Sequence, residues 1–148
     1  MALLSIRDLV KGYPSEWGGL VDVVNVTAFE LQPGEQVLLQ GESGSGKSTL
    51  LNLIAGIVVA DSGEIVLSGE NISSLSESAR DTHRARSLGY VFQNFNLLNG
   101  YSCLENVELG MSFGAGADRE YALQLLARVG LANRHNYRPD QLSQGQKQ

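Results

Sequence analysis

The sequence predicts an α/β fold that is organised around one glycine-rich loop. Residues 41–49 read Gly-Glu-Ser-Gly-Ser-Gly-Lys-Ser-Thr and match the pattern G-x-x-x-x-G-K-[ST]. An apolar run at 37–39 precedes this stretch, and a largely apolar run at 50–55 follows it. This context predicts the order strand, loop, helix, in which the pattern forms a phosphate-binding P-loop.

The residue types at 41–49 suit contact with the phosphate groups of a nucleotide. Glycines let the backbone fold around an anion without Cβ clashes, and the loop N–H groups and the helix N-terminus then face the phosphates. Lys47 is expected to reach the β- and γ-phosphates, and the Ser48 hydroxyl to ligate Mg²⁺. The predicted nucleotide-binding residues of the loop are Gly41, Glu42, Ser43, Gly44, Ser45, Gly46, Lys47, Ser48 and Thr49. The alternative is a glycine turn followed by a chance Lys-Ser pair.

Length, composition and charge restrict the class of protein. The chain has 148 residues, 43% of them hydrophobic and 18% charged, as in a soluble globular domain that buries a core. The net charge of −5 argues against a nucleic-acid partner, which requires a basic face. The single cysteine, Cys103, excludes an internal disulfide and is expected to be buried. No apolar run reaches the roughly 20 residues that span a bilayer, so any membrane role requires a partner.

The segments before the loop are expected to form strands. Residues 3–10 carry apolar side chains among polar ones and predict a first strand, which 11–14 should break because they contain glycine and proline. Residues 21–31 are rich in β-branched side chains and predict a second strand. A turn at 32–35 follows, and the strand before the loop is expected to begin at Gln36.

The helix after the loop is expected over 46–55, with Gly56 as the residue that ends it. Its apolar side chains cover nearly all sides, which predicts a helix buried on every face. Three further elements are expected after a turn at 61–64: a strand at 65–67, an exposed helix at 74–86 and a strand at 88–92.

From residue 94 onward the pattern becomes helical. Residues 104–113 can form a helix, and 118–129 form the clearest amphipathic segment. Asp118 is expected to cap the start of this second helix and Gly130 to end it. Its predicted core face consists of Ala122, Leu125, Leu126 and Val129.

A second motif lies near the C-terminus, where residues 142–146 read Leu-Ser-Gln-Gly-Gln. Taken alone, such a polar stretch is typical of a surface loop. The P-loop, Gln93 at the end of an expected strand and this L-S-x-G-Q run occur in the order and at about the spacing of ABC-transporter ATPase subunits. The chain resembles the N-terminal two-thirds of such a nucleotide-binding domain over essentially all of its length. The resemblance implies a P-loop NTPase fold of the ABC ATPase type, with an antiparallel β subdomain and the start of a helical subdomain.

Two further stretches resemble one bacterial branch of this family, which serves lipoprotein release, macrolide efflux and cell division. They are LGYVFQNFNLL at 88–98 and LENV at 104–107, and sister families share versions of both. The resemblance implies ATP and Mg²⁺ as cofactors, a second ATP-binding subunit as partner, and integral-membrane permease subunits. It also implies a cytoplasmic protein that is peripheral on the inner (plasma) membrane through the permease.

The resemblance assigns roles to residues outside the P-loop. Tyr13 matches the aromatic that stacks on adenine, the alternative being a surface aromatic beside Pro14. Gln93 matches the residue that contacts Mg²⁺ and the attacking water through its amide, the alternative being a solvent-exposed glutamine. Lys47 and Gln93 are thus the expected catalytic residues, and Ser48 and Gln93 the expected metal ligands.

Ser143, Gly145 and Gln146 match the signature motif, which in the family reaches the γ-phosphate held by the P-loop of a second subunit. Gln144 stands where glycine is commoner, and little effect is expected because Ser143 and backbone N–H groups would make the contacts. The implied domains are an ATP-binding core at 1–94 and a helical subdomain at 95–148, which docks onto the permease.

One family feature is absent from the sequence, because no apolar run of four ends in Asp-Glu. In the family such a strand follows the signature motif, and its Asp completes Mg²⁺ binding while its Glu polarises water. We therefore expect that this chain alone does not hydrolyse ATP and that it is a fragment or truncation of a longer protein. We also expect exposed apolar edges and a P-loop helix that is only half covered.

Two other functions remain open on the sequence. The first is an ABC-type ATPase without transport, such as a regulator of a cell-division complex that acts through a membrane protein. The second is a degenerate nucleotide-binding module without turnover. A GTPase or a kinase does not predict the L-S-x-G-Q run at 142–146.

Overall fold

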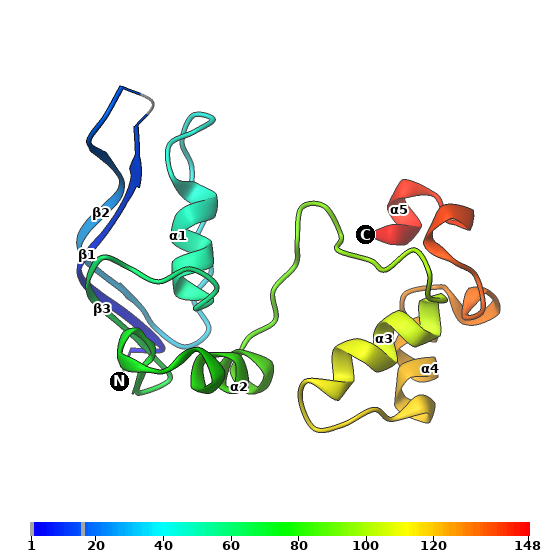
Figure 1. Cartoon of the computed structure of the whole chain (residues 1–148). Coiled ribbons are helices and arrows are strands. Elements are labelled where there is room, and N and C mark those ends of the chain that lie inside the picture. The colour runs from blue at the N-terminus through cyan, green and yellow to red at the C-terminus, as the bar shows by residue number, and fades with distance from the viewer. Residues whose placement is uncertain (1, 16) are drawn as a thin grey trace. The chain divides into compact units, whose positions relative to one another are not determined.

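The computed structural model describes residues 2–15 and 17–148 (Figure 1). The chain divides into two compact units, Met1–Leu88 and Gly89–Gln148, which we call the N-terminal unit and the helical unit. Each unit contains its own cluster of buried apolar side chains. The division between the units falls six residues before the boundary at 94/95 that the sequence predicts.

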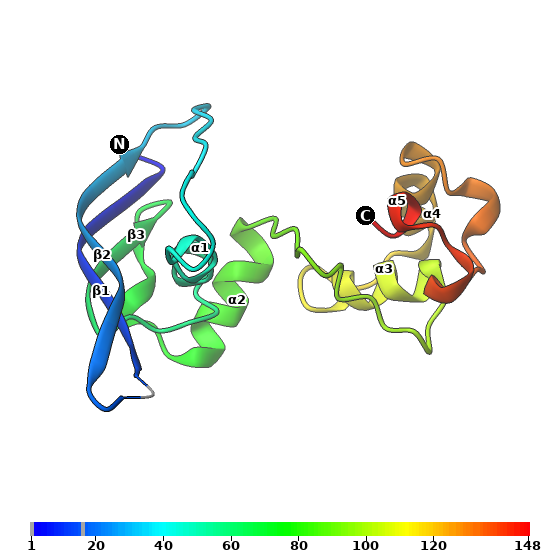
Figure 2. The same ribbon diagram turned by 90° about the horizontal axis from the view of Figure 1, so that it is seen from above.

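A four-stranded antiparallel sheet in the order β2-β1-β3-β4 forms the N-terminal unit's framework. The strands are β1 (Leu4–Pro14), β2 (Leu20–Leu31), β3 (Ser62–Leu67) and β4 (Glu70–Asn71). Leu4, Ile6 and Leu9 of β1 are buried, and Ile65 and Leu67 of β3 join them in the core. One face of the sheet is therefore apolar and is covered by α1 (Lys47–Ile54), as Figures 1 and 2 show.

The predicted break of the first strand at 11–14 is wrong, because β1 continues to Pro14. A β-bulge between Lys11 and Gly12 absorbs the irregularity, and Tyr13 and Pro14 then pair with β2. Proline is tolerated there because β1 has left β3 by that point, so its missing N–H removes no bond of the ladder on that side. The predicted turn at 61–64 is also wrong in part, because β3 already begins at Ser62.

The prediction that the P-loop helix is buried on every face is wrong. Within α1 only Leu53 is fully buried, and Leu50 and Ile54 pack partly against the sheet core. Leu51 on the other side is 48% exposed. The helix thus has one covered face in the described residues, which agrees with the expectation of a half-covered P-loop helix. Gly56, with φ of +65°, ends the helix as predicted.

The strands predicted from Gln36 and at 88–92 are not formed in the structure. A strand exists only where a neighbour accepts its hydrogen bonds, and in the described residues only β1 to β4 pair with one another. The apolar side chains of both segments remain accessible, with exposed fractions of 60% for Val37, 78% for Leu38 and 84% for Val91. This exposure agrees with the expectation of exposed apolar edges.

In the N-terminal unit, a side chain of α2 (Glu77–Ser87) binds the C-terminal end of α1. A 3-10 turn, η1 (Ile72–Ser74), follows β4, and α2 begins at the N-cap Ser76. From α2, Arg84 Nη1 donates to the carbonyl oxygens of Ala55 and Gly56, both at 3.3 Å. Its Nη2 is held 2.5 Å from Asp81 Oδ1. A guanidinium at a helix C-terminus satisfies free carbonyl groups and complements the helix dipole, so Arg84 anchors α1 at the end opposite the P-loop.

Replacing Arg84 by alanine is expected to lower the free energy of unfolding of the protein by about 1–2 kcal/mol, because two helix-terminal carbonyls lose their charged donor. Denaturant unfolding measures the change. Arg86→Ala is the matched control, since Arg86 lies in the same last turn of α2 and is exposed. Equal losses for the two variants would show that the contact with α1 contributes nothing.

The helical unit contains α3 (Cys103–Ser112), α4 (Arg119–Arg128) and α5 (Gln144–Lys147), with 3-10 turns η2 (Ala132–Arg134) and η3 (Pro139–Gln141). Asp118 caps α4 by accepting from the Tyr121 N–H at 2.9 Å, and Gly130 adopts a φ of +79° after it, both as predicted. The hydrophobic core cluster of this unit consists of Cys103, Leu104, Ala122, Leu126, Leu131 and Leu142.

The predicted core face of α4 is wrong at one position. Val129 is 70% exposed, because it is the C-cap residue and the helix has ended there. Cys103 is buried as predicted, and this burial raises the pKa of its thiol. Among residues 2–15 and 17–148, no helix combines the length and the apolar content that crossing a membrane requires.

Candidate nucleotide-binding site

The glycine-rich loop leads directly into α1, whose N-cap is Gly46. Gly44 and Gly46 adopt φ values of +83° and +84°, in the left-handed region that glycine enters without strain. Gly46 also lies against β2, because a Cβ at this position would be 2.3 Å from the carbonyl oxygen of Val23. The loop therefore requires glycine here for both its backbone conformation and its packing on the sheet.

Lys47 directs its ammonium group back into the loop. Its Nζ donates to the carbonyl oxygens of Gly41 at 2.8 Å and Glu42 at 2.6 Å, and lies 3.3 Å from Ser45 Oγ. These neutral acceptors hold the positive charge over the loop without neutralising it. A phosphate group that enters the loop would thus meet a charged donor already in place, together with the N-terminal N–H groups of α1. Ser48 follows in the first turn and is exposed.

A recess of about 190 Å³ lies beside the loop and is lined by Val23 to Val26 of β2 together with residues of the loop and α1. Tyr13 belongs to the same region, because it pairs with Val21, two residues from the Val23 carbonyl that contacts the loop. Two residues of a strand span about 7 Å. The Tyr13 ring is partly exposed, at 39% for the residue, so it is available to a base whose phosphates occupy the loop.

Substituting Gly46 by alanine is expected to cost about 3 kcal/mol of the free energy of unfolding, because strain and a clash with Val23 add together. Gly44→Ala is the matched control, since Gly44 has the same φ but no atom lies within 4 Å of an added Cβ. This variant should lose only about 1 kcal/mol. Denaturant unfolding of both variants without nucleotide measures the difference, and equal losses would contradict the packing of Gly46 on Val23.

Gln93 and the signature motif belong to the helical unit, whereas the P-loop belongs to the N-terminal unit. Gln93 is exposed and directly follows Phe92, whose ring lies 4.6 Å from that of Tyr90 between centroids. The two predicted Mg²⁺ ligands, Ser48 and Gln93, are thus carried by different units. The described part of the chain contains no group of three or more His, Cys, Asp or Glu side chains that could hold a metal ion.

The signature residues form a reciprocal cap at the start of α5. Ser143 Oγ accepts from the Gln146 N–H at 3.3 Å, and Gln146 Oε1 accepts from the Ser143 N–H at 3.0 Å. This capping box holds Ser143 in an extended conformation ahead of the helix, and it leaves Ser143 and Gly145 exposed. The hydroxyl of Ser143 is therefore occupied internally but accessible to an incoming anion.

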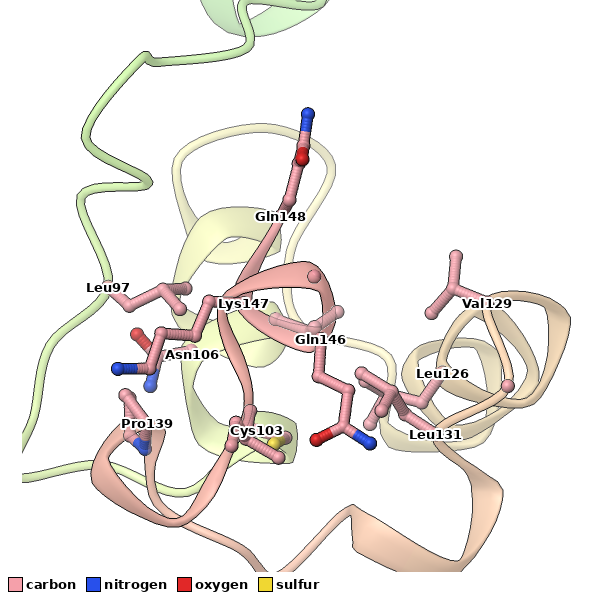
Figure 3. Close-up of a pocket in the computed structure, with 14 residues that line it drawn as sticks. Leu97, Cys103, Asn106, Leu126, Val129, Leu131, Pro139, Gln146, Lys147 and Gln148 are labelled. Carbon is pink, nitrogen blue, oxygen red and sulfur yellow. The ribbon is translucent and has the colours of Figure 1, made fainter.

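A groove of about 340 Å³ lies within the helical unit. Figure 3 shows α5 along this groove, with Gln146 and Lys147 near Cys103 and Leu131. Its lining is mostly apolar, and Lys147 is the one charged side chain among the described residues that line it. It lacks the convergent donors that a triphosphate requires, so the smaller recess beside the P-loop is the better nucleotide site.

Sequence reasoning missed Val23, whose carbonyl oxygen lies against Gly46. It also missed the ion pair of Lys11 and Asp61, which lies beside the Tyr13 ring. Val23 acts through its backbone carbonyl, which no side-chain pattern reveals. Lys11 and Asp61 are 50 residues apart and meet only because β1 and β3 are neighbours in the sheet.

A P-loop at the N-terminus of a helix, packed on an antiparallel sheet and followed by a helical unit, defines a P-loop NTPase fold of the ABC ATPase type. Residues 24–148 match the family model described as ABC transporter. The chain belongs to this family.

Similar proteins and similar solved structures support this family membership. The chain is 44% identical to the lipoprotein-releasing system ATP-binding proteins LolD of Pseudomonas fluorescens and Pseudomonas syringae pv. tomato, in each case over 99% of this chain and 66% of the relative. A dimeric structure of the ATP-binding cassette MJ0796 in a post-hydrolysis state, bound to ADP and Pi, is 32% identical with a TM-score of 0.88. A second dimeric structure, of the bacterial ABC transporter cassette MJ0796, is 30% identical with a TM-score of 0.85.

These matches differ in how much of each chain they cover. Both structures cover 97% of this chain, which in turn covers 65% of each of them. The chain thus spans just under two thirds of the length of the relatives that it matches.

Proposed function

We propose that the full-length protein is the ATP-binding subunit of an ABC transporter and that it hydrolyses ATP to drive a membrane permease. The observation that carries the proposal is the P-loop, in which the Lys47 ammonium is held over the loop by the Gly41 and Glu42 carbonyls. The family membership and the identity of 44% to two LolD proteins support ATP as the nucleotide.

In the proposed mechanism the chain's own residues bind and orient the nucleotide. Lys47 and the N-terminal N–H groups of α1 hold the β- and γ-phosphates, and Tyr13 stacks on the base. Ser48 and Gln93 would hold Mg²⁺, which when bound neutralises the charge that develops on the phosphates. Both offer neutral oxygen ligands, which suit this hard cation. Gln93 also orients the attacking water through its amide.

A second copy of the subunit completes the proposed site. Ser143, Gly145 and Gln146 of one copy reach the γ-phosphate that the P-loop of the other copy holds. The exposure of Ser143 and Gly145 at the capped start of α5 supports this role. The dimeric structures of MJ0796, one of them bound to ADP and Pi, support the dimer.

The proposed partners are integral-membrane permease subunits, and the proposed location is the cytoplasmic face of the inner membrane. The helical subdomain at 95–148 would dock onto the permease. The LolD proteins are named for a lipoprotein-releasing system, and their similarity supports lipoproteins as the cargo.

Nucleotide titration of the purified full-length protein tests the proposal. We expect saturable binding of ATP in the presence of Mg²⁺ and release of inorganic phosphate at a rate that rises when the permease is present. Binding without any phosphate release would favour a module without turnover, and absence of binding would exclude an ATP-binding subunit.

A further inference from the structure

The C-terminal end of β1 pairs with β2 but not with β3. The last residue of β1 that pairs with β3 is Val10, opposite Ser62, so the segment from Lys11 to Pro14 pairs only with β2. The bulge between Lys11 and Gly12 disturbs the ladder at the same point. This segment carries Tyr13, the ring that we propose stacks on the base, so on the side where β3 is missing the position of the segment depends on other contacts.

Asp61 supplies these contacts from the residue just before β3. Its backbone N–H donates to the Val10 carbonyl at 2.9 Å, and its Oδ2 accepts from the Gly12 N–H at 2.7 Å. Its Oδ1 lies 2.7 Å from Lys11 Nζ. The Asp61 carboxylate thus accepts the hydrogen bond of the Gly12 N–H, which has no partner in β3. The hydrogen bond from the Gly12 N–H, and to a lesser extent that from Lys11, lowers the pKa of Asp61 below its usual range. The carboxyl group of Asp61 is therefore ionised at neutral pH.

Lys11 connects this carboxylate to the aromatic ring. Its Nζ lies 5.6 Å from the centroid of the Tyr13 ring, within the range of a cation–π interaction. The Lys11 side chain is only 17% exposed, so most of its surface is in contact with the protein. Lys11 therefore lies between Asp61 and one face of Tyr13, while Tyr13 remains partly open to solvent.

We propose that Asp61, acting through Lys11 and the bulge at Gly12, is a positioning residue that orients Tyr13 for stacking on the nucleotide base. The inference rests on the proposed function, because it assumes that Tyr13 contacts the base of a bound nucleotide. It adds a specific consequence, namely that Asp61 contributes to recognition of the base and not to recognition of the phosphates.

Comparing two ligands in the full-length protein separates these contributions. ATP carries base and phosphates, whereas inorganic tripolyphosphate carries only phosphates, and both are titrated by calorimetry with Mg²⁺. Asp61→Ala is expected to raise the Kd for ATP about fivefold and to leave the Kd for tripolyphosphate within about twofold. Asp61→Asn, which keeps an oxygen for the Gly12 N–H but removes the charge, should raise the Kd for ATP by a smaller factor. Lys11→Met should change the two affinities in the same way as Asp61→Ala.

Glu77→Ala is the matched control, since Glu77 is an exposed carboxylate of α2 in the same unit, and neither affinity should change. Equal weakening of ATP and tripolyphosphate in the Asp61 and Lys11 variants would overturn the inference, because it would indicate general damage to the site. Unchanged ATP affinity in these variants would also overturn it. If the unsubstituted protein binds tripolyphosphate but not ATP, or binds neither, the proposed function itself fails.

Discussion

Replacing Lys47 by alanine in the full-length protein is expected to abolish ATP turnover. The Nζ of Lys47 is held over the P-loop by two backbone carbonyls, and no other lysine lies in the described residues of the loop. Removing it leaves the charge of the β- and γ-phosphates without its side-chain donor, and the rate should fall at least about 100-fold. Phosphate release at saturating ATP measures the effect.

Arg86→Ala serves as the control for this variant, because it removes one exposed cation from the same unit and should leave turnover unchanged. Circular dichroism of both variants verifies that they are folded. A Lys47→Ala protein that is folded and retains full turnover would refute the assignment of 41–49 as the catalytic P-loop.

Ser143→Arg is expected to prevent the ATP-dependent dimer while leaving ATP binding to the single subunit intact. Ser143 is exposed and its hydroxyl caps α5, so arginine removes the cap and adds bulk and charge at the surface that we propose faces the second subunit. Gel filtration with ATP in a hydrolysis-deficient background measures dimer formation, and calorimetry measures binding to the monomer.

Asn133→Arg is the matched control for Ser143→Arg, since it places the same side chain at an exposed position of η2 in the helical unit. This control should still form dimers with ATP. Should the Ser143→Arg protein also dimerise normally, the signature motif would have no role across the dimer in this protein.

The loop and its helix could be predicted from the sequence because both are local. The glycines, Lys47 and the apolar run after them lie within fifteen residues of one another, so the pattern carries its own structural context. The cap at Asp118 and the helix end at Gly130 were predictable for the same reason.

Features that depend on distant partners could not be predicted. Residues 36–40 have a strand-like composition, yet without a neighbouring strand in the described residues they form no strand and remain exposed. Lys11 to Pro14 have the composition of a turn, yet pairing with β2 keeps them in a strand. In the candidate site, the contact of Asp61 with Gly12 depends on the register of the sheet, which a single sequence does not reveal.

The sheet topology has a consequence for synthesis on the ribosome. The four paired strands of the described residues, β1 to β4, lie within residues 4–71. Each pairs antiparallel with its neighbour, and short connections or one intervening helix join them in sequence. The sheet can therefore form while the rest of the polypeptide is still being made. Residues 37–39, which are apolar and exposed, would then remain unpaired after the sheet has folded. We expect a chaperone to bind this segment during translation.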